Sequence, residues 1–151
     1  MPELKAARKT RMAMAALFFL AWAAAIQPGH AWAEASVWDG IYTREQAERG
    51  RTLYAKECAS CHKDNLAGHG TTPSLSGADF VEKWDGETIG DLFEKIQTSM
   101  PADHPGRLSR EQNAAVLAFI LRFNDFPAGD TELRTDADWL AKVRFTAAKS
   151  K

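Results

Sequence analysis

Three segments of this chain combine a helix-capping signal with apolar residues at helical spacing. The capping pairs, each three residues apart, are Thr43–Gln46, Thr88–Asp91 and Ser109–Gln112. The apolar positions behind them mark one buried face on each helix: Ala47, Gly50, Tyr54 and Cys58 in the first, Ile89, Leu92, Phe93 and Ile96 in the second, and Val116, Phe119, Ile120 and Phe123 in the third. We therefore expect helices over residues 43–58, from residue 88 to near residue 98, and from residue 109 to a point before Pro127.

The segment between the first two helices is predicted to be a loop. Its sequence, LAGHGTTPSLSGADF (residues 66–80), is rich in Gly, Ser, Thr and Pro, which favour turns. No stretch of the chain alternates apolar and polar residues over a useful strand length. We therefore expect an all-α fold with three or more helices and long loops. Such a fold has a thin core and needs a further apolar element.

The first 33 residues have the layout of a secretory signal peptide. Four basic residues precede an uncharged run of fifteen residues, Met12–Ile26, and Ala31 and Ala33 follow with A-x-A cleavage spacing. An uncleaved membrane anchor is the alternative, but the apolar run is short for a span of about 20 residues. We expect cleavage after Ala33, a periplasmic location, and no stable membrane insertion of the 118 residues that remain.

The remaining chain has room for one domain, which we place over residues 43–126. Residues 34–42 form a lead-in, and residues 127–151 are expected to fold back on the domain, with Trp139, Leu140 and Val143 as anchors. Residues 34–151 carry 15 basic and 19 acidic residues, because four of the 19 basic and one of the 20 acidic residues lie in the leader. A net charge of −4 gives no electrostatic basis for binding nucleic acid.

The only two cysteines, Cys58 and Cys61, are separated by two residues, and His62 follows directly. A disulfide here would close a very short loop and remove little chain entropy. A thioredoxin-like redox pair requires a strand before the motif, whereas a helix is predicted there. Zinc needs a fourth ligand, for which only His69 or His104 remain at unfamiliar spacing. Covalent haem fits best, because C-x-x-C-H is the attachment signature of c-type haem and occurs here beside an export signal. One haem, held by two thioether bonds, would also supply the missing apolar element.

The sequence offers candidates for both axial positions of the haem iron. His62 is the expected proximal ligand, and its second ring nitrogen then needs a hydrogen-bond acceptor. Met100 is the only methionine after the leader. A lone methionine at a helix end is by default core filling, but its uniqueness and the following Pro101 favour an iron ligand in a His/Met pair. His69 and His104 are competitors, both in polar loops where a solvated histidine is the default.

Together these features resemble the class I c-type cytochromes, small monohaem electron-transfer proteins. In that family the first helix carries a glycine eight residues before the first haem cysteine and an aromatic residue four before it, as Gly50 and Tyr54 do here. An aromatic residue of the last helix, matched by Phe119, packs on that glycine. The resemblance runs from about Thr43 to Phe123, and it implies the cytochrome c fold, wrapped around one covalent haem.

The resemblance also implies roles for site residues. The family's P-x-L-x-G segment is matched by residues 73–77, so the Pro73 carbonyl is the implied hydrogen-bond acceptor for His62. Met100, followed by proline, stands in the family's usual context for the distal ligand. Trp84 is a candidate donor to a haem propionate, as a tryptophan is in some relatives, with plain core packing as the equal alternative.

The implied function is one-electron transfer. With His62 and Met100 on the iron, no axial position is left for a substrate, so we expect a carrier and not an enzyme. We expect a monomer that exchanges electrons with a donor dehydrogenase and with an acceptor oxidase or another cytochrome, through a haem edge near Ala59–Ser60 and Met100–Pro101. The segments TSMPADHPGRLS and FNDFPAG resemble those of bacterial cytochromes that accept electrons from periplasmic dehydrogenases, including quinoprotein dehydrogenases. The alternatives are a haem enzyme or gas sensor with a displaceable distal ligand, and a fixed cytochrome subunit of a dehydrogenase complex.

Overall fold

The computed structural model describes residues 35–149, so the expected signal peptide and its cleavage site lie outside the described residues. The helical elements of this part are η1 (Val37–Asp39), α2 (Arg44–Glu57), α3 (Ala59–His62), α4 (Ala78–Trp84), α5 (Ile89–Ser99), α6 (Arg110–Phe123) and α7 (Ala137–Leu140). Residues 35–149 contain isolated β-bridges but no strand, and the all-α prediction is confirmed. None of these helices is long and apolar enough to cross a bilayer.

Helices α2, α5 and α6 are the three that the sequence predicts. The side chains of Thr43, Thr88 and Ser109 each cap a helix, and the reciprocal bond of a capping box forms in α5 and α6. In α2 this half of the prediction is wrong, because the Gln46 side chain exchanges hydrogen bonds of 2.7 and 3.1 Å with the backbone of Leu133. Gln46 is buried, and a buried amide needs partners at both ends, which the Leu133 N–H and carbonyl supply.

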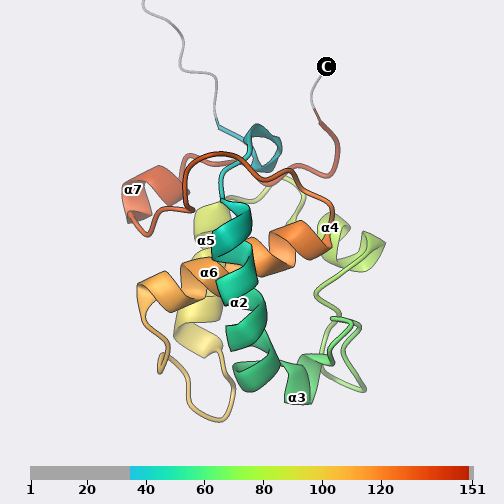
Figure 1. The fold of residues 1–151 in the computed structure, drawn as a ribbon. Helices are drawn as coiled ribbons and strands as arrows, with labels where there is room; N and C mark the ends of the chain where they lie inside the picture. Colours follow the sequence, from blue (N-terminus) through green and yellow to red (C-terminus); the bar gives the residue numbers. More distant parts are fainter. Residues whose placement is uncertain (1–34, 150–151) are drawn as a thin grey trace, which may run out of the picture. The chain divides into compact units, whose positions relative to one another are not determined.

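Helices α2 and α6 cross in close contact, as Figure 1 shows. A Cβ atom added to Gly50 would lie 1.7 Å from the Ala115 carbonyl oxygen and 3.0 Å from the Val116 nitrogen. The two backbones therefore touch at Gly50, which explains a glycine inside a helix despite its cost of about 1 kcal/mol relative to alanine. The nearest contact to Gly50 is thus made by the α6 backbone, while the ring of Phe119 packs on Tyr54 with centroids 5.1 Å apart.

Phe123 does not face inward as the helical spacing predicts. Its side chain is 43% exposed, whereas Val116, Phe119 and Ile120 are buried. Phe123 is the last residue of α6, two turns beyond the crossing with α2, and its ring meets only the edge of Phe119 in an aromatic contact at 6.0 Å. Helical spacing predicts which face of a helix is apolar, but not how far along the helix other elements pack against that face.

The predicted loop over residues 66–80 is wrong at its end, because α4 begins at Ala78. This helix has seven residues, one fully buried side chain (Phe80), and no side-chain cap at Gly77. A helix this short shows neither a capping signal nor a readable hydrophobic period, so tertiary packing of Phe80 decides its formation.

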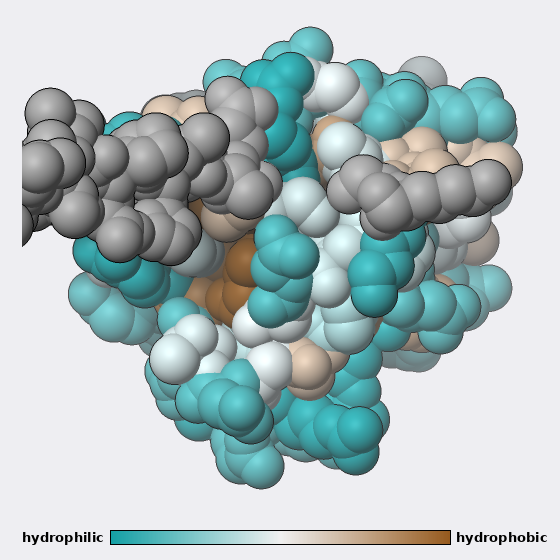
Figure 2. Space-filling view, turned by 90° about the horizontal axis from the view of Figure 1, so that it is seen from above, coloured by the Kyte–Doolittle hydropathy of each residue, from teal (hydrophilic) through white to brown (hydrophobic). Residues whose placement is uncertain are grey.

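The C-terminal segment packs between the lead-in and the start of α5, at the end of α2 that lies away from α3 (Figure 1). The Ile89 N–H donates to the Val143 carbonyl (2.8 Å), and Arg144 exchanges backbone hydrogen bonds with the lead-in through Ala35 and Val37 (2.7 and 3.0 Å). Leu140 and Val143 are buried, and Trp139 is half-buried. Figure 2 shows that the surface on this side is mostly hydrophilic, with a small hydrophobic recess near its centre.

Phe145 is the residue of this segment whose loss we expect to destabilise the fold most. Its ring is fully buried between Phe80 and Phe126, at centroid distances of 6.0 and 5.1 Å. Phe145→Ala should lower the free energy of unfolding by about 3–5 kcal/mol, because the cavity cannot fully collapse. Thermal or denaturant unfolding followed by circular dichroism measures this. The matched control is Phe123→Ala at the exposed phenylalanine. Equal losses in the two variants would contradict the packing of the C-terminal segment.

Candidate haem site

The two cysteines lie on one short turn that directly follows α2. Cys58 is the C-cap residue of α2, and its carbonyl accepts hydrogen bonds from the N–H groups of Cys61 (3.2 Å) and His62 (2.9 Å). Both thiols are free, Cys58 half-buried and Cys61 exposed. Burial, followed by the Glu57 carboxylate, raises the pKa of the Cys58 thiol to about 11. A thiol neutral at pH 7 does not match the reactive thiolate of a disulfide oxidoreductase.

His62 is buried, and the loop that follows it orients its ring. Nδ1 lies 3.0 Å from the Pro73 carbonyl oxygen. Since a carbonyl only accepts, Nδ1 carries a hydrogen, and Nε2 is the ring nitrogen left to bind a metal. The loop returns to His62 through a hydrogen bond from the Gly68 N–H to the His62 carbonyl (3.0 Å). Gly68 has φ +69°, and a Cβ atom there would lie 2.3 Å from the Thr72 carbonyl oxygen.

Met100 is the C-cap residue of α5 and begins the loop of residues 100–108, here called the distal loop. Met100 is half-buried, and its N–H donates to the Ile96 carbonyl (3.0 Å). Arg107 of this loop pairs with the Glu57 carboxylate, whose side chain is only 10% exposed. Glu57 immediately precedes Cys58, so this ion pair holds the distal loop beside Cys58. The sequence does not reveal this pair, because neither residue carries a local signal of a partner fifty positions away.

The other candidate residues lie elsewhere. His69 and His104 are exposed on the two loops, and Trp84 ends α4 half-buried against the core, with the Lys83 ammonium 6.0 Å from its ring centroid. Residues 35–149 contain no group of three or more His, Cys, Asp and Glu side chains placed to hold a metal ion, which is the donor set that the zinc alternative requires.

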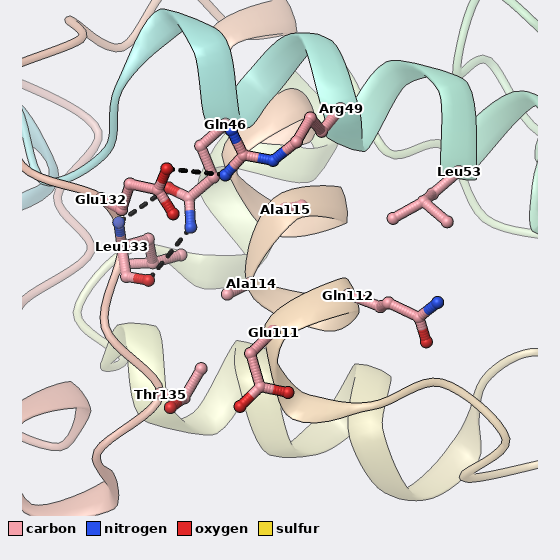
Figure 3. A pocket seen from close by; sticks show the side chains of 10 residues that line it. All are labelled: Gln46, Arg49, Leu53, Glu111, Gln112, Ala114, Ala115, Glu132, Leu133 and Thr135. Carbon is pink, nitrogen blue, oxygen red and sulfur yellow. Dashed lines mark hydrogen bonds and ion pairs between the residues drawn. The ribbon is translucent and has the colours of Figure 1, made fainter.

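A pocket of about 260 Å³ lies apart from the thiols and Met100, between α2, α6 and residues 132–135 (Figure 3). Ala114, Ala115, Leu53 and Leu133 supply its apolar lining, and the Arg49–Glu132 ion pair (2.7 Å) lies at its edge. Cys58, Cys61, His62 and Met100 do not line this pocket. It therefore belongs to the contact between the C-terminal segment and the two crossed helices, not to the haem site.

An all-α fold with a C-x-x-C-H turn and a buried, oriented histidine defines a c-type cytochrome of class I. The family model described as "Cytochrome C oxidase, cbb3-type, subunit III" matches residues 45–120, half of the chain, and the chain belongs to this family. Among solved structures, the sulfane dehydrogenase SoxCD from Paracoccus pantotrophus is similar, with 28% identity, a TM-score of 0.45, and coverage of 67% of this chain and 56% of that chain. No curated protein matches.

A c-type cytochrome domain carries covalently bound haem c with its iron, and the residues present fit that group. Two free thiols on one turn match the two bonds of haem c, and His62 directly after them has its Nδ1 engaged by the Pro73 carbonyl, which leaves Nε2 as the ring nitrogen that would bind the iron. Haem c supplies an iron that gains and loses one electron, and the domain therefore transfers electrons to and from redox partners.

Proposed function

We propose that this protein is an exported monohaem carrier of single electrons, with His62 and Met100 as axial ligands of the iron. The observation that carries the proposal is the 3.0 Å contact between Nδ1 of His62 and the Pro73 carbonyl. It fixes the tautomer and the ring orientation, leaving Nε2 for one permanent bond. A fixed proximal ligand keeps structural change small when the charge of the iron changes.

The proposed distal ligand sets the chemistry of the second axial position. Met100 contributes a soft thioether, which favours ferrous iron and raises the reduction potential. The Glu57–Arg107 ion pair supports this position by holding the distal loop beside Cys58. With both axial positions taken by side chains, substrates are excluded, and the protein acts as a carrier and not as an enzyme.

The proposed partners are other redox proteins outside the cytoplasm, consistent with a class whose members are typically exported. We place electron exchange at the surface near Ala59–Ser60 and Met100–Pro101, where docking would be small and transient. The donor would be a periplasmic dehydrogenase, including the quinoprotein type, and the acceptor an oxidase or another cytochrome. Cleavage after Ala33 would release a soluble monomer whose net charge of −4 argues against a docking face ringed by lysines.

Carbon monoxide tests the carrier proposal against a haem enzyme or gas sensor. The reduced haem-loaded protein should keep its Soret spectrum when carbon monoxide is added, because Met100 would occupy the coordination position that the gas needs. The ferric protein should show the weak far-red band of a sulfur–iron bond. A carbon monoxide shift in the wild-type protein would favour the sensor or enzyme and defeat the carrier proposal.

A further inference from the structure

A chain of three polar groups closes the base of the distal loop. Gln97 lies on the last turn of α5, three residues before Met100. Its Nε2 donates to the carbonyl of Leu108 (3.1 Å), the last residue of the loop. Its Oε1 accepts from Nδ2 of Asn113 on α6 (2.6 Å). One side chain thus joins the two ends of the segment that begins with Met100.

The Leu108 carbonyl sets the direction of these hydrogen bonds. A backbone carbonyl can only accept, so Gln97 must present Nε2 to Leu108 and Oε1 to Asn113. Asn113 must then present Nδ2, which leaves its Oδ1 as the remaining acceptor. Asn113 is fully buried, and its Oδ1 has no hydrogen-bond partner within residues 35–149.

The unpaired oxygen is an argument that Asn113 is not placed here for its own hydrogen bonding alone. A buried acceptor without a partner is costly, and an apolar side chain in its place would remove that cost. Asn113 also stands in an otherwise apolar stretch of α6, where residues 114–121 are all buried and apolar. The Asn113 amide orients the Gln97 side chain, and Gln97 in this orientation holds the Leu108 carbonyl.

We propose that Asn113 and Gln97 are positioning residues that keep the distal loop closed and so hold Met100 on the iron. The inference rests on the proposed function, since it takes Met100 as the distal ligand. Local opening of a loop can precede global unfolding when few contacts secure it. The contacts that secure the distal loop include this relay at its base, the Glu57–Arg107 pair, and backbone bonds from the His104 N–H to the Pro101 carbonyl (3.0 Å) and from the Gly106 N–H to the Met100 carbonyl (3.3 Å).

The test compares two glutamines of the haem-loaded protein, the half-buried Gln97 and the buried Gln46. Gln97→Leu removes the hold on Leu108. Gln46→Leu is the matched control, because the Gln46 amide holds the C-terminal segment through Leu133 in the same manner, as Figure 3 shows. Imidazole binding to the ferric protein requires the sulfur to leave. The apparent affinity for imidazole should rise about tenfold in Gln97→Leu and stay unchanged in Gln46→Leu, since it scales with the fraction of open loop.

Hydrogen exchange gives a second readout that does not depend on the iron. The amides of Met100, His104 and Gly106 should exchange faster in Gln97→Leu than in the wild type, and not in Gln46→Leu. Asn113→Leu is the second variant and should melt close to wild type, because it also removes the unpaired Oδ1. It should nevertheless bind imidazole more tightly, because Gln97 loses the partner that orients it.

The outcomes separate this inference from the proposed function. A wild-type protein without the sulfur–iron band defeats Met100 as ligand, and the inference with it. A wild-type protein with the band, combined with imidazole affinities that are equal in Gln97→Leu and Gln46→Leu, overturns the positioning role and leaves the proposed function standing. Higher imidazole affinity and faster exchange in Gln97→Leu alone support the inference.

Discussion

Gly50→Val is expected to lower the free energy of unfolding by about 3 kcal/mol, the upper part of the range for overpacking. The added Cβ would lie 1.7 Å from the Ala115 carbonyl oxygen, a backbone atom that cannot rotate away. Helices α2 and α6 must therefore separate, and their contact is the most extensive between any two helices of the described chain. A domain with a total of about 5–15 kcal/mol has little reserve for such a loss. The thioether bonds should keep the haem attached throughout.

Thermal unfolding by circular dichroism measures the effect, with an expected drop in melting temperature of roughly 10 °C. Gly50→Ala should also destabilise, because the collision already occurs at Cβ. Ala55→Val is the matched control: it places the same side chain on the exposed face of α2 and costs only helix propensity, at most about 0.7 kcal/mol. A Gly50→Val protein that melts at or above the wild-type temperature would contradict the close crossing of α2 and α6.

Met100→Ala should produce the largest functional change. Removal of the proposed sulfur ligand opens one axial position, so the reduced variant should bind carbon monoxide stoichiometrically where the wild type binds none. The far-red sulfur–iron band should disappear, and the reduction potential should fall because the ligand that favours ferrous iron is gone. Optical titration and redox potentiometry measure these changes, while circular dichroism should show a helical content like that of the wild type.

The two competing histidines provide the controls for Met100. His69 and His104 are exposed, and His69→Ala and His104→Ala should leave the spectrum, the potential and the resistance to carbon monoxide unchanged. If the sulfur–iron band survives in Met100→Ala, or if either histidine variant acquires carbon monoxide binding, the proposed ligand pair is wrong.

Local sequence information was sufficient for the attachment turn and for the three main helices. Cys58, Cys61 and His62 lie within five consecutive residues, so a single turn brings them together whatever surrounds it. The caps at Thr43, Thr88 and Ser109 act within three residues and were equally readable. The family resemblance added the contact of His62 with Pro73, which is eleven residues away and cannot be deduced from local pattern alone.

The tertiary structure determines the hydrogen-bond and ion-pair partners of the polar side chains discussed above. The Gln46 side chain bonds the Leu133 backbone and does not complete the predicted capping box, because its buried amide needs partners at both ends. Gln97 and Asn113 look like ordinary helix residues in the sequence, and their relay to Leu108 exists only because α5 and α6 pack together. The Glu57–Arg107 pair likewise depends on the path of the distal loop.

The sequence by itself therefore determined the class of this protein and the turn that brings its C-x-x-C-H motif together, since these depend on contacts between near neighbours in the chain. The tertiary structure alone decided how far the apolar face of α6 is covered, that α4 forms around Phe80, and how the distal loop is held. These features depend on long-range burial, which sets the free energy of every unpaired polar group and every exposed ring. Spacing along a chain carries no measure of that burial.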